Sequence, residues 1–118
     1  MKVKTHSLST HFNIVTLFIG SSNPQQIGLA RLITDEVTFA YLTDVYILQQ
    51  YQEKGLGSFL INCVNESLSS WPELRGAFLI TTGLQDFYAK RLEMIPFDGA
   101  KEGMQWMVKR GPAYSLSD

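Results

Sequence analysis

The feature that most constrains the fold of this chain is a glycine-containing segment, Gln52–Gly57, between two different hydrophobic patterns. Before it, Phe39 to Leu48 (FAYLTDVYIL) is apolar on both alternating faces, which predicts a central β-strand covered on both sides. After it, from Gly55 to Ser70, apolar residues recur at helical spacing. Glycines at a helix start let the backbone approach an anion. Taken alone, however, Gly55 and Gly57 favour a simple tight turn.

The rest of the chain predicts four further elements and one last strand. Strands are expected at Phe12–Ile19, Ile27–Thr34 and Ala77–Thr81, a second helix at Leu84–Glu93, and a final strand at Met104–Lys109. The strands Phe12–Ile19, Ile27–Thr34 and Phe39–Leu48 suggest an antiparallel meander, and the helix from Gly55 to Ser70 suggests a crossover. We therefore expect an α/β or α+β fold with a mixed, mostly antiparallel sheet flanked by two helices.

Length and composition narrow the class of protein. With 118 residues, 45% of them hydrophobic, the chain is expected to form one globular domain over residues 1–118. A net charge of -1 gives no reason to expect nucleic acid. The single cysteine, Cys63, lies on the apolar helical stripe and is interpreted as a packing residue. No apolar run is long enough for a membrane span, so a cytoplasmic or nuclear protein is expected.

The segment DVYILQQYQEKGLGSFLINCV resembles the acetyl-CoA-binding core of the GNAT superfamily of N-acetyltransferases. The loop fits the pattern Gln/Arg-x-x-Gly-x-Gly/Ala. The resemblance extends from about Gln26 to Arg110 and includes FYAKRLEMIPF, similar to the family's second conserved helix with its tyrosine. Two other nucleotide motifs do not fit, because the Walker pattern is absent and a Rossmann fingerprint would need glycine at Leu60.

The resemblance implies acetyl-CoA or CoA as co-substrate and assigns its contacts. The strand before the loop would line the pantetheine arm through main-chain atoms of Val45, Tyr46 and Ile47. The residues that would wrap the pyrophosphate, mainly through backbone amides, are Gln52, Glu53, Lys54, Gly55, Leu56, Gly57 and Ser58.

Two side chains are candidates for the chemistry. Tyr88 matches by resemblance the tyrosine that acts as general acid near the CoA sulfur, although an ordinary core tyrosine is the alternative. Asp44, the carboxylate inside the central strand, is either the base that takes the amine proton or a structural acceptor, and the structural role is favoured. A strand amide near Tyr46 or Ile47 would meet the oxyanion. Neither His6 nor His11 has the spacing of a metal site, so no metal is expected.

The chain departs from the family pattern in two places. Glu93-Met94 stands where the family usually has Gly-Phe after the tyrosine helix, which is expected to change the local turn. Only Met1 to Thr10 precedes the first clear strand, so the usual N-terminal strand and helices, which form one wall of the acceptor site, are expected to be missing.

These observations predict an N-acetyltransferase acting on a small-molecule or peptide primary amine by direct attack. A CoA-binding module of the same fold with little or no catalysis is the alternative, and an interaction subunit completed by a partner is a third. Uncovered sheet faces predict self-association as a homodimer, and exchange of the strand Met104–Lys109 is one way to form it.

Overall fold

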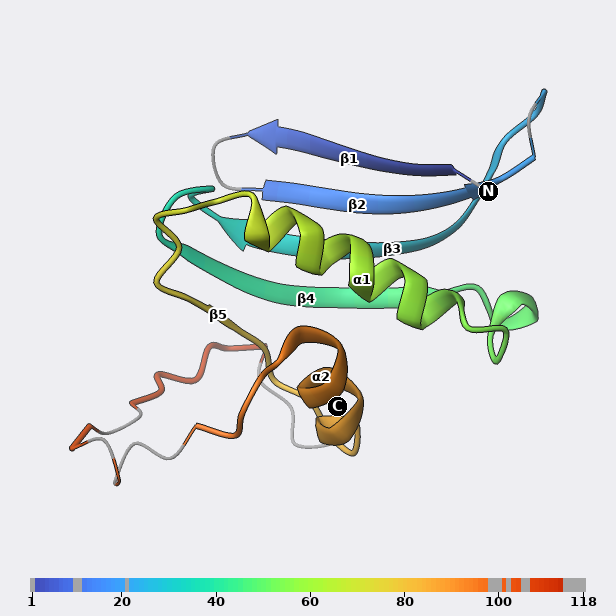
Figure 1. Cartoon of the computed structure of the whole chain (residues 1–118). Coiled ribbons are helices and arrows are strands. Elements are labelled where there is room, and N and C mark those ends of the chain that lie inside the picture. The colour runs from blue at the N-terminus through green and yellow to red at the C-terminus, as the bar shows by residue number, and fades with distance from the viewer. Residues whose placement is uncertain are drawn as a thin grey trace.

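The computed structural model describes residues 2–9, 12–20, 22–97, 101, 103–104 and 107–113; for residues 2, 6–9 and 12 it describes the backbone only. In these residues five strands form one sheet with two α-helices (Figure 1). The elements are β1 (Lys2–Ser9), β2 (Phe12–Ile19), β3 (Gln25–Thr34), β4 (Phe39–Ile47), a 3-10 turn (Gln49–Tyr51), α1 (Leu56–Ser69), β5 (Gly76–Phe78) and α2 (Gln85–Leu92).

The strands follow one another across the sheet in chain order. Neighbours from β1 to β4 pair antiparallel, whereas β5 pairs parallel with β4 after the crossover through α1. The predicted meander, the crossover and the mixed, mostly antiparallel sheet are therefore confirmed. The strand and helix boundaries fall within a few residues of those expected, because the apolar periodicity changes sharply at the glycine loop.

One face of the sheet carries the hydrophobic core. Helix α1 lies across β2, β3 and β4 on this face (Figure 1). Its side chains Leu60, Ile61 and Val64 are completely buried, and α2 adds Tyr88 and Leu92. The alternate residues of the strands meet them, and these include Val15, Leu17, Ala30, Leu32, Ala40 and Leu42. Among the described residues no helix covers the other face, where Phe39 and Tyr46 of β4 are 45% and 53% exposed, so the described part of the chain does not cover β4 on both sides as expected.

A strand lies where none was expected. Residues Lys2–Ser9 form β1, which pairs with β2 from Lys2↔Phe18 to Ser9↔Phe12. The prediction that the usual N-terminal strand is missing is therefore wrong. Polar residues hid this strand, because an edge strand contributes few side chains to the core; Val3 packs against it. Only Thr10 and His11 separate β1 from β2 in the sequence, which leaves no room for a helix between them.

Two predicted elements differ at the C-terminal side. The strand expected at Ala77–Thr81 forms over Gly76–Phe78 only. The strand expected at Met104–Lys109 is absent at residues 104 and 107–109, and residues 105 and 106 lie outside the described part. Met107 and Val108 are largely exposed there, 89% and 78%. A strand-like sequence is not enough, because a strand also needs a paired neighbour for its backbone groups.

The turn after α2 has the left-handed backbone that glycine usually provides, although the sequence has Glu93 at this position. Glu93 ends the helix with φ 55°, in the left-handed region. That is the conformation in which glycine usually ends a helix. The substitution of glutamate for glycine therefore leaves the path of the turn in place, at the conformational cost of a side chain in the left-handed region.

Candidate functional site

The loop after β4 is fixed to the end of that strand by hydrogen bonds. The backbone N–H of Leu48 donates to the carbonyl of Ile27 on β3 at 2.8 Å, and the N–H of Tyr51 donates to Leu48 at 2.8 Å. The side-chain amide of Gln52 then donates to the carbonyl of Ile47, also at 2.8 Å. The first residue of the loop motif thus holds the loop against the strand with its side chain. This role was not predicted for Gln52.

Gly55 connects the loop to α1 and has a left-handed backbone conformation. Gly55 has φ 79° and precedes the helix with no side-chain cap. The first intrahelical bond runs from the N–H of Phe59 to the carbonyl of Gly55 at 3.2 Å. The N–H groups of Leu56, Gly57 and Ser58 lie ahead of it and have no partner within the helix. This helix end therefore presents several donors in one direction, as an anion site requires.

The two glycines leave open space where a side chain would stand. A Cβ atom added at Gly55 or at Gly57 would meet no atom of the described residues within 4 Å, apart from chain neighbours and the helix's own backbone. Gly55 needs its positive φ, whereas Gly57 has an ordinary helical backbone. Packing within the chain therefore does not require a glycine at 57, so a reason for it must be sought in what approaches the helix from outside.

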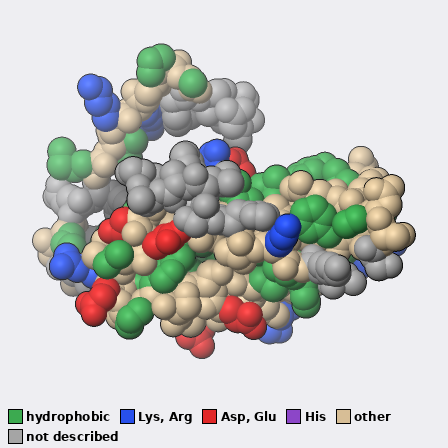
Figure 2. Space-filling view, turned by 90° about the horizontal axis from the view of Figure 1, so that it is seen from above, with side chains coloured by type: hydrophobic (Ala, Val, Ile, Leu, Met, Phe, Trp, Pro, Cys, Tyr) green, Lys and Arg blue, Asp and Glu red, His purple; other side chains and the backbone are tan. Residues whose placement is uncertain are grey.

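The charges of the loop are exposed. Lys54 lies with its Nζ 5.8 Å from the centre of the Tyr51 ring, a cation–π distance that holds a positive charge beside the helix end. Glu53 is also exposed and has φ 64°. Over the face shown in Figure 2, basic and acidic side chains are scattered among hydrophobic ones. Because these surface charges do not gather in one place, the N-terminal end of α1 is a better defined anion site than the surface shown in Figure 2.

Next to this loop, β4 and β5 separate. They pair only at Phe39↔Gly76, Ala40↔Ala77 and Tyr41↔Phe78. Beyond Tyr41, β4 continues to Ile47 while β5 ends at Phe78, so among the described residues this stretch has a strand neighbour on its β3 side only. We call this unpaired side of β4, beyond Tyr41, the opening.

The backbone directions at the end of β4 follow from the hydrogen bonds. Because the N–H of Leu48 points to β3, the N–H and carbonyl of the preceding residue, Ile47, point to the opposite side, toward the opening. The carbonyl of Ile47 is taken by Gln52. The Ile47 N–H is thus the group that faces the opening as a donor. Val45 packs against the core and Tyr46 is 53% exposed on the other face.

Tyr88 lies in the core cluster between α2 and α1. Its side chain is buried, and burial raises the pKa of its hydroxyl. The ring packs edge-on against Phe87, with centroids 5.2 Å apart. Within the described part of the chain its hydroxyl makes no hydrogen bond. A buried phenol with a raised pKa stays protonated at neutral pH, which suits a proton donor as well as a core residue.

Asp44 lies at an irregularity in β4. The pairing with β3 shifts between Arg31↔Thr43 and Leu29↔Tyr46, so that Asp44 and Val45 lie opposite Ala30 alone. Asp44 has φ 54° and its carboxylate contacts Arg31 at 2.6 Å. This partner was not predicted, although Arg31 is the only charged residue within the β3 sequence. The Asp44 carboxylate thus has a partner within the chain, and the choice between a base and a structural acceptor stays a prediction. The ion pair also places Asp44 on the face opposite Tyr88.

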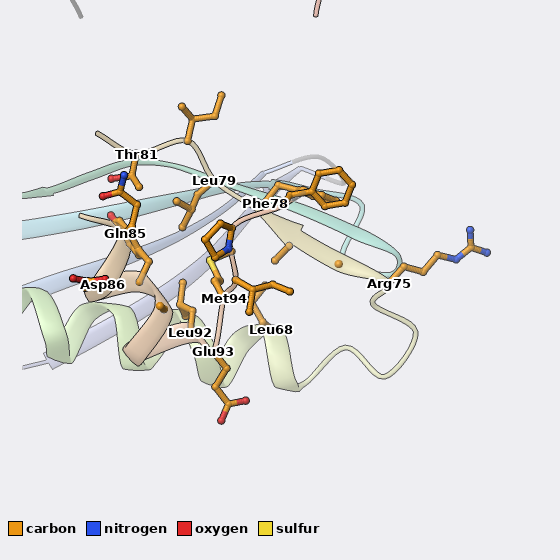
Figure 3. Close-up of a pocket in the computed structure, with 18 residues that line it drawn as sticks. Leu68, Arg75, Phe78, Leu79, Thr81, Gln85, Asp86, Leu92, Glu93 and Met94 are labelled. Atoms are coloured by element: carbon orange, nitrogen blue, oxygen red, sulfur yellow. The ribbon is translucent and has the colours of Figure 1, made fainter. Parts of the chain in front are cut away.

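A cavity of about 860 Å³ lies beside Tyr88. Its walls come from residues 76–81, from α2 and from residues 93–97. Figure 3 shows the side chains of Leu79, Leu92 and Met94 gathered there, whereas Arg75 and Glu93 point away. The interior is therefore apolar. The loop 52–58 takes no part in lining it, so the predicted pyrophosphate loop and this cavity are separate features.

In the described ranges no three His, Cys, Asp or Glu side chains gather as a set of metal ligands. Neither described helix combines the length and apolar character of a membrane span.

Comparisons with known proteins point in one direction. The model of the Acetyltransferase (GNAT) family matches residues 4–93. A Gibberella zeae protein named "Putative acetyltransferase FG08082" is 45% identical over 91 residues, which cover 75% of this chain and 51% of that protein. The chain thus spans about half the length of the curated relative that it matches.

Solved structures show the same fold. A crystal structure described as a "putative acetyltransferase belonging to the gnat family" from Xanthomonas campestris has a TM-score of 0.64 and 28% identity, covering 83% of this chain and 66% of that one. A GNAT family acetyltransferase from Streptococcus pneumoniae has a TM-score of 0.58 and 23% identity, covering 89% and 75%. The second likeness concerns the fold alone.

Proposed function

The chain belongs to the GNAT family of acetyltransferases, and we propose that it transfers acetyl from acetyl-CoA to a primary amine by direct attack. One observation supports this most. The opening between β4 and β5 leads directly to the loop and to the free donors at the start of α1. In CoA an extended arm that ends in a thiol is followed by a pyrophosphate. The arm would lie along the unpaired side of β4, and the pyrophosphate would then reach the N–H groups at the start of α1.

We assign the cofactor contacts as follows. The N–H groups at Leu56, Gly57 and Ser58 would bind the pyrophosphate, with Lys54 adding positive charge beside them. Glu53 and Gly55 would contribute through the shape of the loop, since both have positive φ. Along the opening, main-chain atoms of 45–47 would line the pantetheine arm. Of these, the Ile47 N–H is the donor best placed to polarise the thioester carbonyl.

The proposed reaction needs one proton donor and one proton acceptor. The neutral amine attacks the thioester carbon, the C–S bond breaks, and the thiolate takes a proton from Tyr88. The ammonium proton passes to water or to a carboxylate. Asp44 is the candidate from the sequence, but Arg31 already engages it. Water is therefore the simpler acceptor, with Asp44 and Arg31 shaping the acceptor side.

A CoA-binding module with little or no transfer is the second candidate. The observation that favours it is the direct connection from β1 to β2 through Thr10 and His11. No helix stands there to build an acceptor wall. Binding without turnover is the expected behaviour if this wall is needed for catalysis.

Two measurements separate these candidates. Calorimetry with CoA tests the shared part, and acetyl-CoA turnover with a panel of polyamines, amino acids, peptide termini and aromatic amines tests the transfer. CoA binding with amine-dependent release of free thiol supports the transferase. Binding without release supports the module, and no CoA binding at all would refute both.

The general acid has its own test. Tyr88→Phe keeps the ring in the core but removes the hydroxyl, so kcat is expected to fall about 10²–10⁴-fold with little change in KM for acetyl-CoA. Tyr41→Phe, on the opposite sheet face, is the control and should keep the wild-type kcat. Full activity in Tyr88→Phe would show that Tyr88 is only a packing residue.

A further inference from the structure

Two side chains that can both attract a cation lie next to each other at the unpaired end of β4. Asp44 and Tyr46 are two residues apart, and Val45 between them packs against the core, so both project from the opposite face of the sheet. Residues two apart on a strand are separated by about 7 Å. Of the Asp44 side chain 54% is exposed, and Tyr46 is 53% exposed. A carboxylate and an aromatic ring are therefore both accessible to one small ligand.

The Asp44 carboxylate is held in place by one oxygen and keeps the other available. Its Oδ2 lies 2.6 Å from a guanidinium nitrogen of Arg31 on β3. Arg31 lies on the same face as Asp44, because its neighbours Ala30 and Leu32 belong to the core. Among the described residues, Oδ1 of Asp44 has no hydrogen-bond or ion-pair partner. An ionised carboxylate has about four acceptor positions, so Oδ1 can accept a hydrogen bond from a ligand while Arg31 fixes its direction.

The ring of Tyr46 is also available. Within the described part of the chain it makes no contact with another ring or with a cation. A cation within about 6 Å of the centre of an aromatic ring is attracted to its face. An ammonium group that donates to Oδ1 of Asp44 can lie within this distance, since the two side chains start about 7 Å apart. The ring matters here because Arg31 offsets part of the negative charge of the carboxylate.

The distance to the reacting centre decides which nitrogen of an acceptor this pair can hold. In the proposed transfer, the N–H of Ile47 meets the thioester carbonyl. Asp44 lies three residues earlier on β4, about 8–10 Å along the strand when the irregularity is allowed for. The nitrogen that attacks the thioester must lie about 3–3.5 Å from its carbon. Asp44 and Tyr46 are therefore placed to hold a second cationic group of the same acceptor.

We propose that the acceptor is a diamine, and that its second amine binds as an ammonium group between Asp44 and Tyr46. This proposal rests on the transferase function and names its acceptor class. The first amine, in its neutral form, forms a bond to the acetyl carbon as the C–S bond breaks. The thiolate takes a proton from Tyr88, and the proton on the new amide nitrogen passes to water. The second ammonium group keeps its proton throughout.

Two matched acceptors test the proposal by kinetics. Diaminobutane and butylamine share a carbon chain and differ in the second amine, so kcat/KM should favour diaminobutane by about 4- to 25-fold. Asp44→Asn removes the charge, and asparagine tolerates the left-handed backbone of residue 44. This variant and Tyr46→Leu should each lower the preference about 2- to 5-fold through KM. Tyr46→Phe keeps the ring and should keep the preference. A base role of Asp44 would instead lower kcat for both amines.

Calorimetry adds a readout that needs no turnover. Diaminobutane titrated into the protein loaded with CoA should bind about 2- to 5-fold more weakly to Asp44→Asn and to Tyr46→Leu than to wild type. Circular dichroism shows whether each variant is folded. Glu73→Gln, in the exposed loop between α1 and β5, removes the same charge far along the sequence from β4 and should behave as wild type in both assays.

The contrary outcomes distinguish the acceptor from the function. Turnover of both amines with equal kcat/KM would overturn the diamine proposal and leave the transferase in place. A loss of preference in Glu73→Gln as large as in Asp44→Asn would also overturn it, because net charge and not contact would then be the cause. Diaminobutane binding that depends on Asp44 and Tyr46, without any turnover, would refute the transferase and leave the cation site. Neither binding nor turnover would refute both.

Discussion

Replacing Gly57 by valine is expected to weaken CoA binding by about 10- to 150-fold while the protein stays folded. The structure separates the two effects. A Cβ at this position meets none of the described residues within 4 Å, and its backbone is helical, so a side chain fits the fold. The added methyl groups would occupy open space at the first turn of α1, where the pyrophosphate is proposed to bind.

The magnitude follows from one lost contact. A hydrogen bond from an amide to a charged phosphate contributes about 1.5–3 kcal/mol. At about 1.4 kcal/mol per factor of ten, losing one such bond gives the stated range. Stability should change little or rise slightly, because glycine within a helix costs about 0.5–1 kcal/mol relative to alanine.

Calorimetry with CoA and urea unfolding measure the two quantities on the same samples. Gly57→Ala is the matched control: it adds only Cβ, fits the Gly/Ala position of the motif, and should keep CoA affinity within about threefold of wild type. Equal affinities of wild type and Gly57→Val would refute a pyrophosphate at this helix end. Loss of binding together with loss of folding would refute the reading of Gly57 as free of packing constraints.

Three further predictions concern the loop and the turns. Gln52→Met removes the donor to the Ile47 carbonyl and should weaken CoA binding by about 2- to 10-fold, whereas Gln49→Met in the same loop should not; calorimetry shows the difference. Glu93→Gly should raise the free energy of unfolding, measured with urea, by about 1 kcal/mol, because glycine adopts the positive φ of residue 93 without strain, and Glu93→Ala should give no gain. Asp35→Ala should lower the midpoint at pH 7, because hydrogen bonds from the Thr38 hydroxyl and from the N–H groups of Thr38, Val37 and Phe39 hold the pKa of Asp35 far below 3.8. Because the pKa of Asp35 is lowered in the folded state, its hydrogen bonds stabilise the protein fully at pH values above the ordinary pKa of an aspartate. This stabilisation is lost as the pH falls toward the pKa of Asp35 in the folded state. The difference in free energy of unfolding between the variant and wild type should therefore shrink only below about pH 4.

The part of the fold that periodicity controls was predictable. Strands β2 to β4 and helix α1 each bury several side chains, and their alternation is visible in the sequence. Strand β1 was not predicted, since it lies at the edge and its stability comes from backbone pairing with β2. For the run Met104–Lys109 the prediction failed in the opposite direction, because a strand was predicted and the described residues of the run do not form one. Its residues suit a strand, but no backbone neighbour is provided for those that the structure describes.

The candidate site was predictable where a local motif carries it. The loop and the helix start lie where the pattern placed them, because the glycine positions and the change of period are local. The partners of individual side chains were not predictable. Gln52 binds a carbonyl five residues earlier, and Arg31 reaches Asp44 from the neighbouring strand. Both contacts depend on register, and register depends on an irregularity that no residue type marks.

That irregularity in β4 connects the two halves of the proposed site. Placing Asp44 and Val45 opposite Ala30 inserts one extra residue into β4. A bulge of this kind bends its strand and increases its twist, which accounts for the separation of β4 from β5 soon after Tyr41. It also resets the alternation of side chains, so that Val45 and Ile47 return to the core face while Asp44 remains with Arg31 on the opposite face. The same residue insertion therefore lies just beyond the point where β4 loses its β5 neighbour, and it places the charged pair Arg31–Asp44 there, next to the stretch proposed to bind the thioester arm.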